Sequence, residues 1–123
     1  MDWITLAIVA AVVATFVLLQ RMRLVSPTQA LALLKAGGRV IDVRSREEFA
    51  ARSLPGATNV PLDELATRVA KVEPDKNAIL LLHCLSGARS ERARRELTQL
   101  GYAQVFNLGS FSRAERILRR AGS

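Results

Sequence analysis

Apolar and polar residues alternate in blocks along most of this chain, and the period of each block predicts its secondary structure. Residues 78–82 are continuously apolar and bounded by polar residues, which is typical of a strand buried on both faces of a parallel sheet. Over residues 89–100 the apolar positions recur at helical spacing, and this predicts a helix with one buried face. The carboxyl end of a central strand therefore leads through a short loop into a helix.

Further elements follow from helix-start signals, apolar spacing and breaker residues. Ser26 and Ser45 each open a capping box, with Pro27 at a first helical position. The predicted elements are a helix over 27–36, a strand over 39–43, a short helix after Ser45 and a helix over 62–72 that ends at Glu73-Pro74. Strands that alternate with helices predict an α/β domain with a mainly parallel sheet.

The N-terminal segment differs, because residues 4–19 contain no charge and only two polar side chains. From Trp3 to Leu19 a helix would span roughly 25 Å, slightly short of a hydrocarbon core of about 30 Å. Snorkelling of Arg21 and Arg23, with Trp3 at the opposite interface, makes up the difference. No basic residue precedes the run and no Ala-x-Ala site follows it, so we expect an uncleaved transmembrane helix rather than a signal peptide.

The flanking charges predict the orientation of this membrane segment. Asp2 precedes it while Arg21 and Arg23 follow it, so the positive-inside tendency places the N-terminus outside and the domain in the cytoplasm. A single cysteine cannot form an internal disulfide, which fits a reducing compartment. We expect residues 1–23 to form the anchor with its basic flank, and residues 24–123 to form one domain.

The chain is strongly basic, with a formal net charge of +7. From residue 89 onward it carries eight arginines and three glutamates, and such a surface attracts small anions and anionic lipid headgroups. A nucleic-acid-binding face is not expected, because the aromatic residues do not interleave with the arginines. Glu91 with Arg95 and Arg92 with Glu96 stand at i,i+4, which predicts a solvated helix face with ion pairs.

Cys84, the only cysteine, lies between the predicted strand and helix. Backbone N–H groups of the loop and of the helix N-terminus favour a negative charge there. Gly87 permits unusual backbone angles and Arg89 adds a positive charge, so we expect a lowered pKa and a reactive thiolate. The alternative is a small buried hydrophobic residue. His83 should point to the opposite face of the strand, so we assign it a structural or packing role.

Four segments resemble those of a single-domain rhodanese, a sulfurtransferase family that carries sulfur as a cysteine persulfide. They are IDVR and EEF within residues 41–49, LPGATNVPL over 54–62, the C-x-x-G-x-R-S loop over 84–90 and a closing segment within 101–109. The resemblance covers roughly residues 26–121. It implies a rhodanese-like, doubly wound α/β fold with a mainly parallel sheet and helices on both faces, preceded here by the transmembrane helix.

The resemblance also implies a chemistry. Cys84 would take sulfur from a small anionic donor such as thiosulfate and pass it to cyanide or to a thiol, which includes protein thiols. Backbone N–H groups would hold the terminal sulfur, and the loop residues are Leu85, Ser86, Gly87, Ala88 and Arg89. The residues expected to support the site are Ser90, Asp42 and Arg44. Asp42 should bond the adjoining backbone, and Arg44 should pair with Glu47 or Glu48. We expect no cofactor and no metal site.

One segment departs from the family pattern. Where many members have two glycines followed by a tryptophan, this chain has Gly109, Ser110 and Phe111, with Glu115 at the tryptophan position. Residues 112–115 form a capping-box pattern, so we expect the last helix to start there. The departure alters the packing near the loop and leaves the cysteine loop intact.

Two other classes of function are alternatives. A tyrosine phosphatase or arsenate reductase on the same fold would use an H-C-x5-R loop, but Arg89 is five positions after Cys84 where that loop needs six. The shorter loop forms a smaller cradle, which suits a sulfur atom better than a tetrahedral oxyanion. A non-catalytic, membrane-tethered binding module is the other alternative, and the retained cysteine argues against it.

Overall fold

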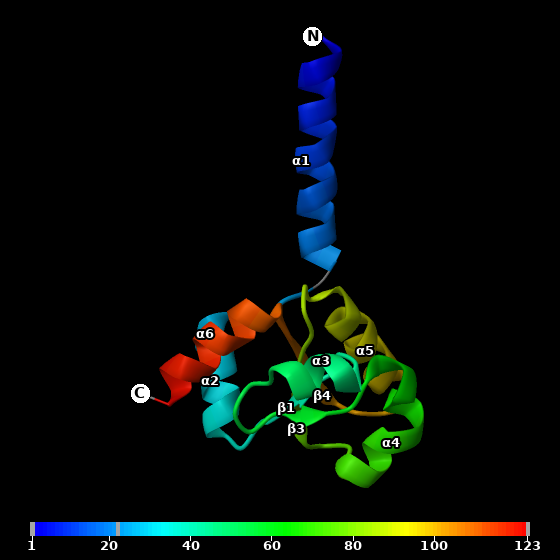
Figure 1. Cartoon of the computed structure of the whole chain (residues 1–123), viewed down its shortest axis with the longest axis vertical. Coiled ribbons are helices and arrows are strands. Elements are labelled where there is room, and N and C mark those ends of the chain that lie inside the picture. The colour runs from blue at the N-terminus through cyan, green and yellow to red at the C-terminus, as the bar shows by residue number, and fades with distance from the viewer. Residues whose placement is uncertain (1, 22, 123) are drawn as a thin grey trace.

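Four parallel strands form the sheet, in the order β2-β1-β3-β4. The computed structural model describes residues 2–21 and 23–122, with the side chains of all of them except residues 19–21. The strands are β1 (Arg39–Asp42), β2 (Thr58–Asn59), β3 (Ile79–His83) and β4 (Gln104–Gly109), and Figure 1 labels β1, β3 and β4. The two strands predicted from the sequence, β1 and β3, are the central pair, so the predicted central position of the apolar run is confirmed.

Helices cover both faces of this sheet, as predicted. Their bounds are α2 (Pro27–Lys35), α3 (Arg46–Ala51), the short 3-10 helix η1 (Leu62–Glu64), α4 (Leu65–Val72), α5 (Ala88–Gln99) and α6 (Phe111–Ala121). α2 and α6 pack on each other against one face of the sheet, while α4 and α5 pack against the other face (Figure 1). The α/β class, the parallel sheet and the helices on both faces are therefore confirmed.

The leucines of β3 are buried on both faces because successive side chains alternate in direction. Leu80 and Leu82 belong to the core beneath α4 and α5, whereas Leu81 belongs to the core beneath α2 and α6. All three are 0% exposed. Full burial of a leucine side chain contributes about 1.5–3 kcal/mol, so this strand anchors both halves of the core. It stays apolar up to its carboxyl end, where the site begins.

Serine caps begin three of the helices. Ser45 caps α3 in a complete capping box, as predicted. Ser26 caps α2 by accepting from the N–H of Gln29, which is the serine half of the predicted box. α6 begins at Phe111 because the hydroxyl oxygen of Ser110 accepts a hydrogen bond from a first-turn N–H. The predicted start of this helix at Ser112 is therefore wrong, since Ser112 already lies inside its first turn.

Helix α1 (Trp3–Arg21) extends away from the domain (Figure 1). The apolar side chains that the structure describes on it are exposed, among them Trp3 at 77% and Phe16 at 59%. Within residues 2–21 and 23–122, no helix combines the length and the apolarity needed to cross a membrane.

This finding does not support the predicted transmembrane helix over residues 4–19. As a helix, the uncharged run of residues 4–19 would span roughly 24 Å, against about 30 Å for a hydrocarbon core. Leu19 and the basic flank at Arg21 lie outside the side chains that the structure describes.

Candidate active site

Cys84 directly follows β3 at the carboxyl edge of the sheet, and its side chain is fully buried. Its Sγ atom lies 3.0 Å from the backbone nitrogen of Gly87 and 3.5 Å from the hydroxyl oxygen of Ser90. The N–H of Gly87 therefore donates a hydrogen bond to the sulfur. Donors aimed at a sulfur atom favour the thiolate over the thiol.

The loop that carries the cysteine is tied to the end of β4. The N–H of Cys84 donates to the carbonyl of Gly109 at 3.2 Å, and the N–H of Phe111 donates to the carbonyl of Leu85 at 3.1 Å. Gly87 is the N-cap of α5 and has a φ of 100°, in the left-handed region that favours glycine. The positive end of the α5 dipole therefore begins within the cysteine loop.

Two opposing effects set the pKa of Cys84. Burial is the largest single effect, and it raises the pKa because a buried thiolate loses its solvation. Hydrogen bonds from Ser90, Gly87 and Ser86 act in the other direction, and together they hold the pKa of Cys84 below its ordinary value. The direction of the predicted pKa shift is therefore confirmed, and a larger thiolate fraction is present at neutral pH.

Arg89 differs from its predicted role. Its guanidinium forms a bidentate ion pair with Glu48, with N···O distances of 2.6 and 3.0 Å. This pairing lowers the pKa of Glu48 to about 2. The positive charge of Arg89 still acts on the thiol, but a carboxylate on α3 compensates part of it. Hydrogen bonds from Ser90, Gly87 and Ser86 lower the pKa of Cys84, and Arg89 also fastens the start of α5 to α3.

Asp42 and Arg44 form a buried ion pair at the end of β1. Arg44 Nη2 lies 2.7 Å from Asp42 Oδ2, and the backbone N–H of Arg44 donates to Asp42 Oδ1 at 2.9 Å. The predicted bond from Asp42 to the adjoining backbone is confirmed, but the predicted pairing of Arg44 with Glu47 or Glu48 is wrong. Side chains two residues apart in extended backbone point the same way, and Glu48 is already bound to Arg89.

Asn107 is a site residue that the sequence analysis missed. Its fully buried side chain donates from Nδ2 to the carbonyl of Gly87 at 3.1 Å. Its Oδ1 accepts from the hydroxyl of Ser90 at 2.7 Å and from the N–H of Gly109 at 2.8 Å. Asn107 therefore positions both residues that contact the cysteine sulfur. The sequence signal is an amide between apolar neighbours, Phe106 and Leu108, since a buried amide requires several partners.

His83 lies on the opposite side of the strand end from Cys84, as predicted. Its ring is fully buried and packs edge-on against Phe111, with 5.8 Å between ring centres. Its Nε2 lies 3.8 Å from Asp42 Oδ2 and has no hydrogen-bond partner within the part of the chain that the structure describes. Burial lowers the pKa of His83, so the ring is neutral at neutral pH.

The segment that departs from the family pattern packs beside this histidine. The guanidinium carbons of Arg44 and Arg52 each lie 4.7 Å from the centre of the Phe111 ring. Glu115, at the position where many members have tryptophan, forms an ion pair with Arg52 at 2.8 Å. A charge pair and Phe111 therefore fill this region, and the cysteine loop is intact.

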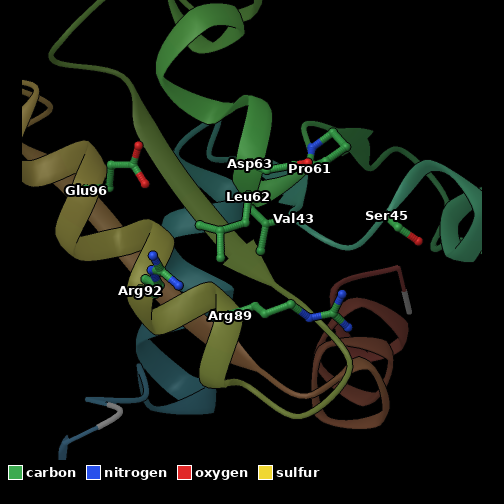
Figure 2. A pocket seen from close by; sticks show the side chains of 8 residues that line it. All are labelled: Val43, Ser45, Pro61, Leu62, Asp63, Arg89, Arg92 and Glu96. Carbon is green, nitrogen blue, oxygen red and sulfur yellow. The ribbon is translucent and has the colours of Figure 1, made fainter.

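A groove of about 440 Å³ opens beside the loop, between α5 and the segment that follows β2 (Figure 2). Its lining comes from residues 43 and 45, residues 61–63, and three side chains of α5: Arg89, Arg92 and Glu96. The first two groups follow the carboxyl ends of β1 and β2, the edge where open parallel sheets bind ligands. Among residues 2–21 and 23–122, no three His, Cys, Asp or Glu side chains converge as a metal site requires.

These features together define an α/β domain built around one thiol, which lies under hydrogen-bond donors at the carboxyl edge of a parallel sheet. The family model of the rhodanese-like domain matches residues 26–114. The chain belongs to the rhodanese-like family, as the resemblance in its sequence predicted.

Individual relatives are sulfurtransferases by name. Thiosulfate sulfurtransferase PspE of Escherichia coli K12 is 39% identical over 69 residues, which are 56% of this chain and 66% of PspE. The chain thus spans just under two thirds of the length of PspE. The human thiosulfate:glutathione sulfurtransferase is 34% identical over 97 residues, covering 68% of this chain and 84% of that protein. The solved structure of the human single-domain sulfurtransferase TSTD1 has a TM-score of 0.64 at 31% identity, over 76% of this chain and 96% of its own.

Proposed function

We propose that this protein is a sulfurtransferase that carries sulfane sulfur as a persulfide on Cys84. The observation that carries the proposal is the position of the Cys84 sulfur, which lies against the N–H of Gly87 and the hydroxyl of Ser90 and has a lowered pKa. A thiolate in such a cradle is a nucleophile and can also hold a transferred sulfur. The names of the relatives support this choice of chemistry.

In the first half-reaction the Cys84 thiolate attacks the outer sulfur of a donor such as thiosulfate. A bond forms between Sγ and that sulfur, the S–S bond of thiosulfate breaks, and sulfite leaves with the bonding electron pair. The product is an anionic Cys84 persulfide. Backbone N–H groups of residues 85–89 stabilise its terminal sulfur, as donors of an oxyanion hole stabilise an oxygen.

In the second half-reaction a thiolate or cyanide attacks the terminal sulfur of the persulfide. The bond between that sulfur and Sγ breaks, and its electron pair returns to Cys84 as the thiolate. The N–H of Gly87 donates to the sulfur and the Ser90 hydroxyl lies beside it, while the ion pair of Asp42 with Arg44 supports the end of the neighbouring strand. The cycle needs no oxidant or reductant.

Two observations weigh against the alternative functions. A phosphatase needs its arginine over the cysteine to bind an oxyanion, whereas Arg89 is committed to Glu48. A binding module needs no activated thiol, whereas four donor contacts from Ser90, Gly87 and Ser86 lower the pKa of Cys84. Both observations favour sulfur transfer.

Product analysis separates the three classes of function. The full-length protein is incubated with thiosulfate and cyanide, and thiocyanate formation is measured; an aryl phosphate is offered in parallel. Sulfur transfer predicts thiocyanate and no phosphate release. Phosphate release without thiocyanate would support the phosphatase. If several donors give neither product after reducing pretreatment, the binding module is the better account.

The location of the protein is a further part of the proposal. We propose that α1 attaches the domain to a membrane, with the N-terminus outside and the domain in the cytoplasm. The exposed apolar side chains of α1 and the arginines that follow the run support attachment. No described helix combines the length and apolarity for crossing, so the experiment that follows distinguishes crossing from attachment to one face of the membrane.

Reporter cysteines in a Cys84→Ser background give that experiment. Asp2→Cys and Gly122→Cys variants are treated in intact cells with a maleimide that cannot cross membranes. Labelling of the Asp2 reporter alone supports the proposed orientation. Labelling of the Gly122 reporter alone reverses it, and protection of both reporters indicates that α1 does not cross.

A further inference from the structure

Two opposite charges in the groove beside the cysteine loop are not paired with each other. The sequence spacing predicts an ion pair between Arg92 and Glu96, one turn apart on α5. That prediction is wrong, because neither side chain has an ion-pair or hydrogen-bond partner among residues 2–21 and 23–122. Both line the groove, and in Figure 2 they extend from separate turns of the helix toward it.

Arg92 is the cation of the groove that is available to a ligand. Arg89, one turn earlier on the same face of α5, is engaged by Glu48 at 2.6 and 3.0 Å. Arg92 is exposed and carries no such partner among the described residues. An anionic group that enters the groove therefore meets a free guanidinium at Arg92, with Glu96 one turn further along.

The groove borders the proposed reaction centre through two shared elements. Arg89 lines the groove and also belongs to the cysteine loop, and Ser90 next to it contacts the Cys84 sulfur. The apolar floor includes Val43, which belongs to the same core cluster as Cys84, and Leu62, which packs against that cluster. A ligand seated there lies alongside the loop that would present the persulfide.

We propose that this groove binds the sulfur acceptor, and that the acceptor is a small thiol of the amino-acid type, with one carboxylate and one ammonium group. The carboxylate binds Arg92 and the ammonium binds Glu96, while the carbon skeleton covers Leu62. The inference rests on the proposed function, because it names the acceptor of the second half-reaction. A volume of about 440 Å³ lies in the usual range for small-molecule sites.

The transfer step balances without any further reactant. The acceptor thiolate attacks the terminal sulfur of the Cys84 persulfide, a new S–S bond forms on the acceptor, and the bond to Sγ breaks. The electron pair returns to Sγ, and the acceptor leaves as its own persulfide. Arg92 and Glu96 take no part in bond making. They determine which thiols reach the persulfide.

Four probe thiols, which differ in the charged groups they carry, distinguish the contribution of Arg92 from that of Glu96. The full-length protein is loaded with thiosulfate and freed of excess donor, and the discharge rate of the persulfide is measured with cysteine, N-acetylcysteine, cysteine methyl ester and 2-mercaptoethanol. Each thiol is compared between variants, so its own pKa cancels. Arg92→Gln should slow cysteine and N-acetylcysteine about three- to fivefold and leave the ester unchanged. Glu96→Gln should slow cysteine and the ester by a similar factor and leave N-acetylcysteine unchanged.

Matched controls carry the same charge changes outside the groove. Arg95→Gln removes an arginine from α5 that pairs with Glu91, and Glu47→Gln removes an exposed glutamate of α3. Neither control should alter the discharge rates. Equal slowing by Arg95→Gln and Arg92→Gln, or slowing of 2-mercaptoethanol to the same extent, would overturn the inference. Discharge by 2-mercaptoethanol in every variant still supports the proposed function, whereas failure to load any persulfide overturns both.

Discussion

Cys84 and His83 are adjacent in the chain and equally buried, yet their surroundings differ completely. The Cys84 sulfur accepts a hydrogen bond from the N–H of Gly87 and lies against the hydroxyl of Ser90. The His83 ring packs on Phe111, and its Nε2 has no hydrogen-bond partner in the described part of the chain. One strand end therefore separates a reactive side of the sheet from a packing side.

The difference teaches that burial alone does not decide whether a titratable group is reactive. Burial raises the pKa of Cys84 and lowers the pKa of His83, so in both residues it favours the neutral form. Only Cys84 has donors that reverse the effect. The turn at Gly87 and the hydrogen bonds of Asn107 place these donors beside the sulfur. The geometry of the loop therefore makes Cys84 reactive.

The largest expected effect concerns the cysteine itself. Cys84→Ser should abolish sulfur transfer, because a serine hydroxyl has too high a pKa to attack thiosulfate at neutral pH. The measurement is thiocyanate formation from thiosulfate and cyanide. His83→Gln serves as the comparison from the packing side and should retain activity. If the serine variant remained active, Cys84 would not be the sulfur carrier.

The next largest expected effect is on the stability of the core around β3, the strand that leads to His83 and Cys84. Leu81→Ala should lower the free energy of unfolding by about 2–5 kcal/mol, as expected for truncation of a fully buried leucine. Chemical denaturation of the full-length chain measures it. A loss below about 1 kcal/mol would contradict the central position of β3.

Asn107→Ala tests whether the lowered pKa of Cys84 depends on the positions of Gly87 and Ser90, which Asn107 holds. It removes the bonds to Gly87 and Ser90, so the pKa of Cys84 should rise, and lost buried hydrogen bonds should cost about 1–3 kcal/mol of stability. The pH dependence of Cys84 alkylation reports the pKa. Asn59→Ala is the matched control, because Asn59 bonds the carbonyls of Asp42 and Arg44 instead.

The control should lose stability without a change in the Cys84 alkylation profile. A similar pKa shift in both asparagine variants would mean that general loosening, and not the contacts of Asn107, sets the reactivity of the thiol. An unchanged profile in Asn107→Ala would leave Asn107 with a purely structural role.

The smallest expected effect is the pH dependence of the free energy of unfolding that His83 causes. The pKa of His83 is lowered in the folded chain, so below about pH 6.5 the unfolded chain binds a proton that the folded chain does not. Stability contributed by the neutral ring is therefore lost as the pH falls. The groups that face the ring are Asp42, Arg44, Phe111 and the backbone carbonyl of Cys84.

Denaturation at about pH 8 and about pH 5.5 measures this linkage, and His83→Gln should lose less stability than the parent chain across this interval. Glu48 does not interfere, because its pKa of about 2 lies well below the interval. Equal losses in both proteins would show that His83 does not titrate on unfolding.

The parts of the fold that sequence reasoning predicted are those fixed by local patterns. The apolar run of β3, the cap at Ser45 and the loop at Gly87 each depend on neighbouring residues, and each was predicted. The start of α6 was misplaced because two serines stand two positions apart and both suit an N-cap. Only the path of the chain out of β4 selects Ser110.

The parts of the site that were mispredicted depend on pairings between distant segments. Arg89 and Glu48 are 41 positions apart, and no local spacing indicates their ion pair. Asn107 reaches Gly87 across 20 positions. Where partners were chosen by proximity in the sequence, as for Arg44 and for Arg92 with Glu96, the three-dimensional arrangement differed.

Mass spectrometry of the full-length protein after exposure to thiosulfate shows directly whether Cys84 forms a persulfide. The protein is reduced, treated with thiosulfate, digested and analysed for the mass of the peptide that contains Cys84. We expect one added sulfur atom on Cys84, which cyanide then removes. An unmodified Cys84 after exposure to several sulfur donors, in protein that retains its fold, would show that Cys84 does not carry the sulfur.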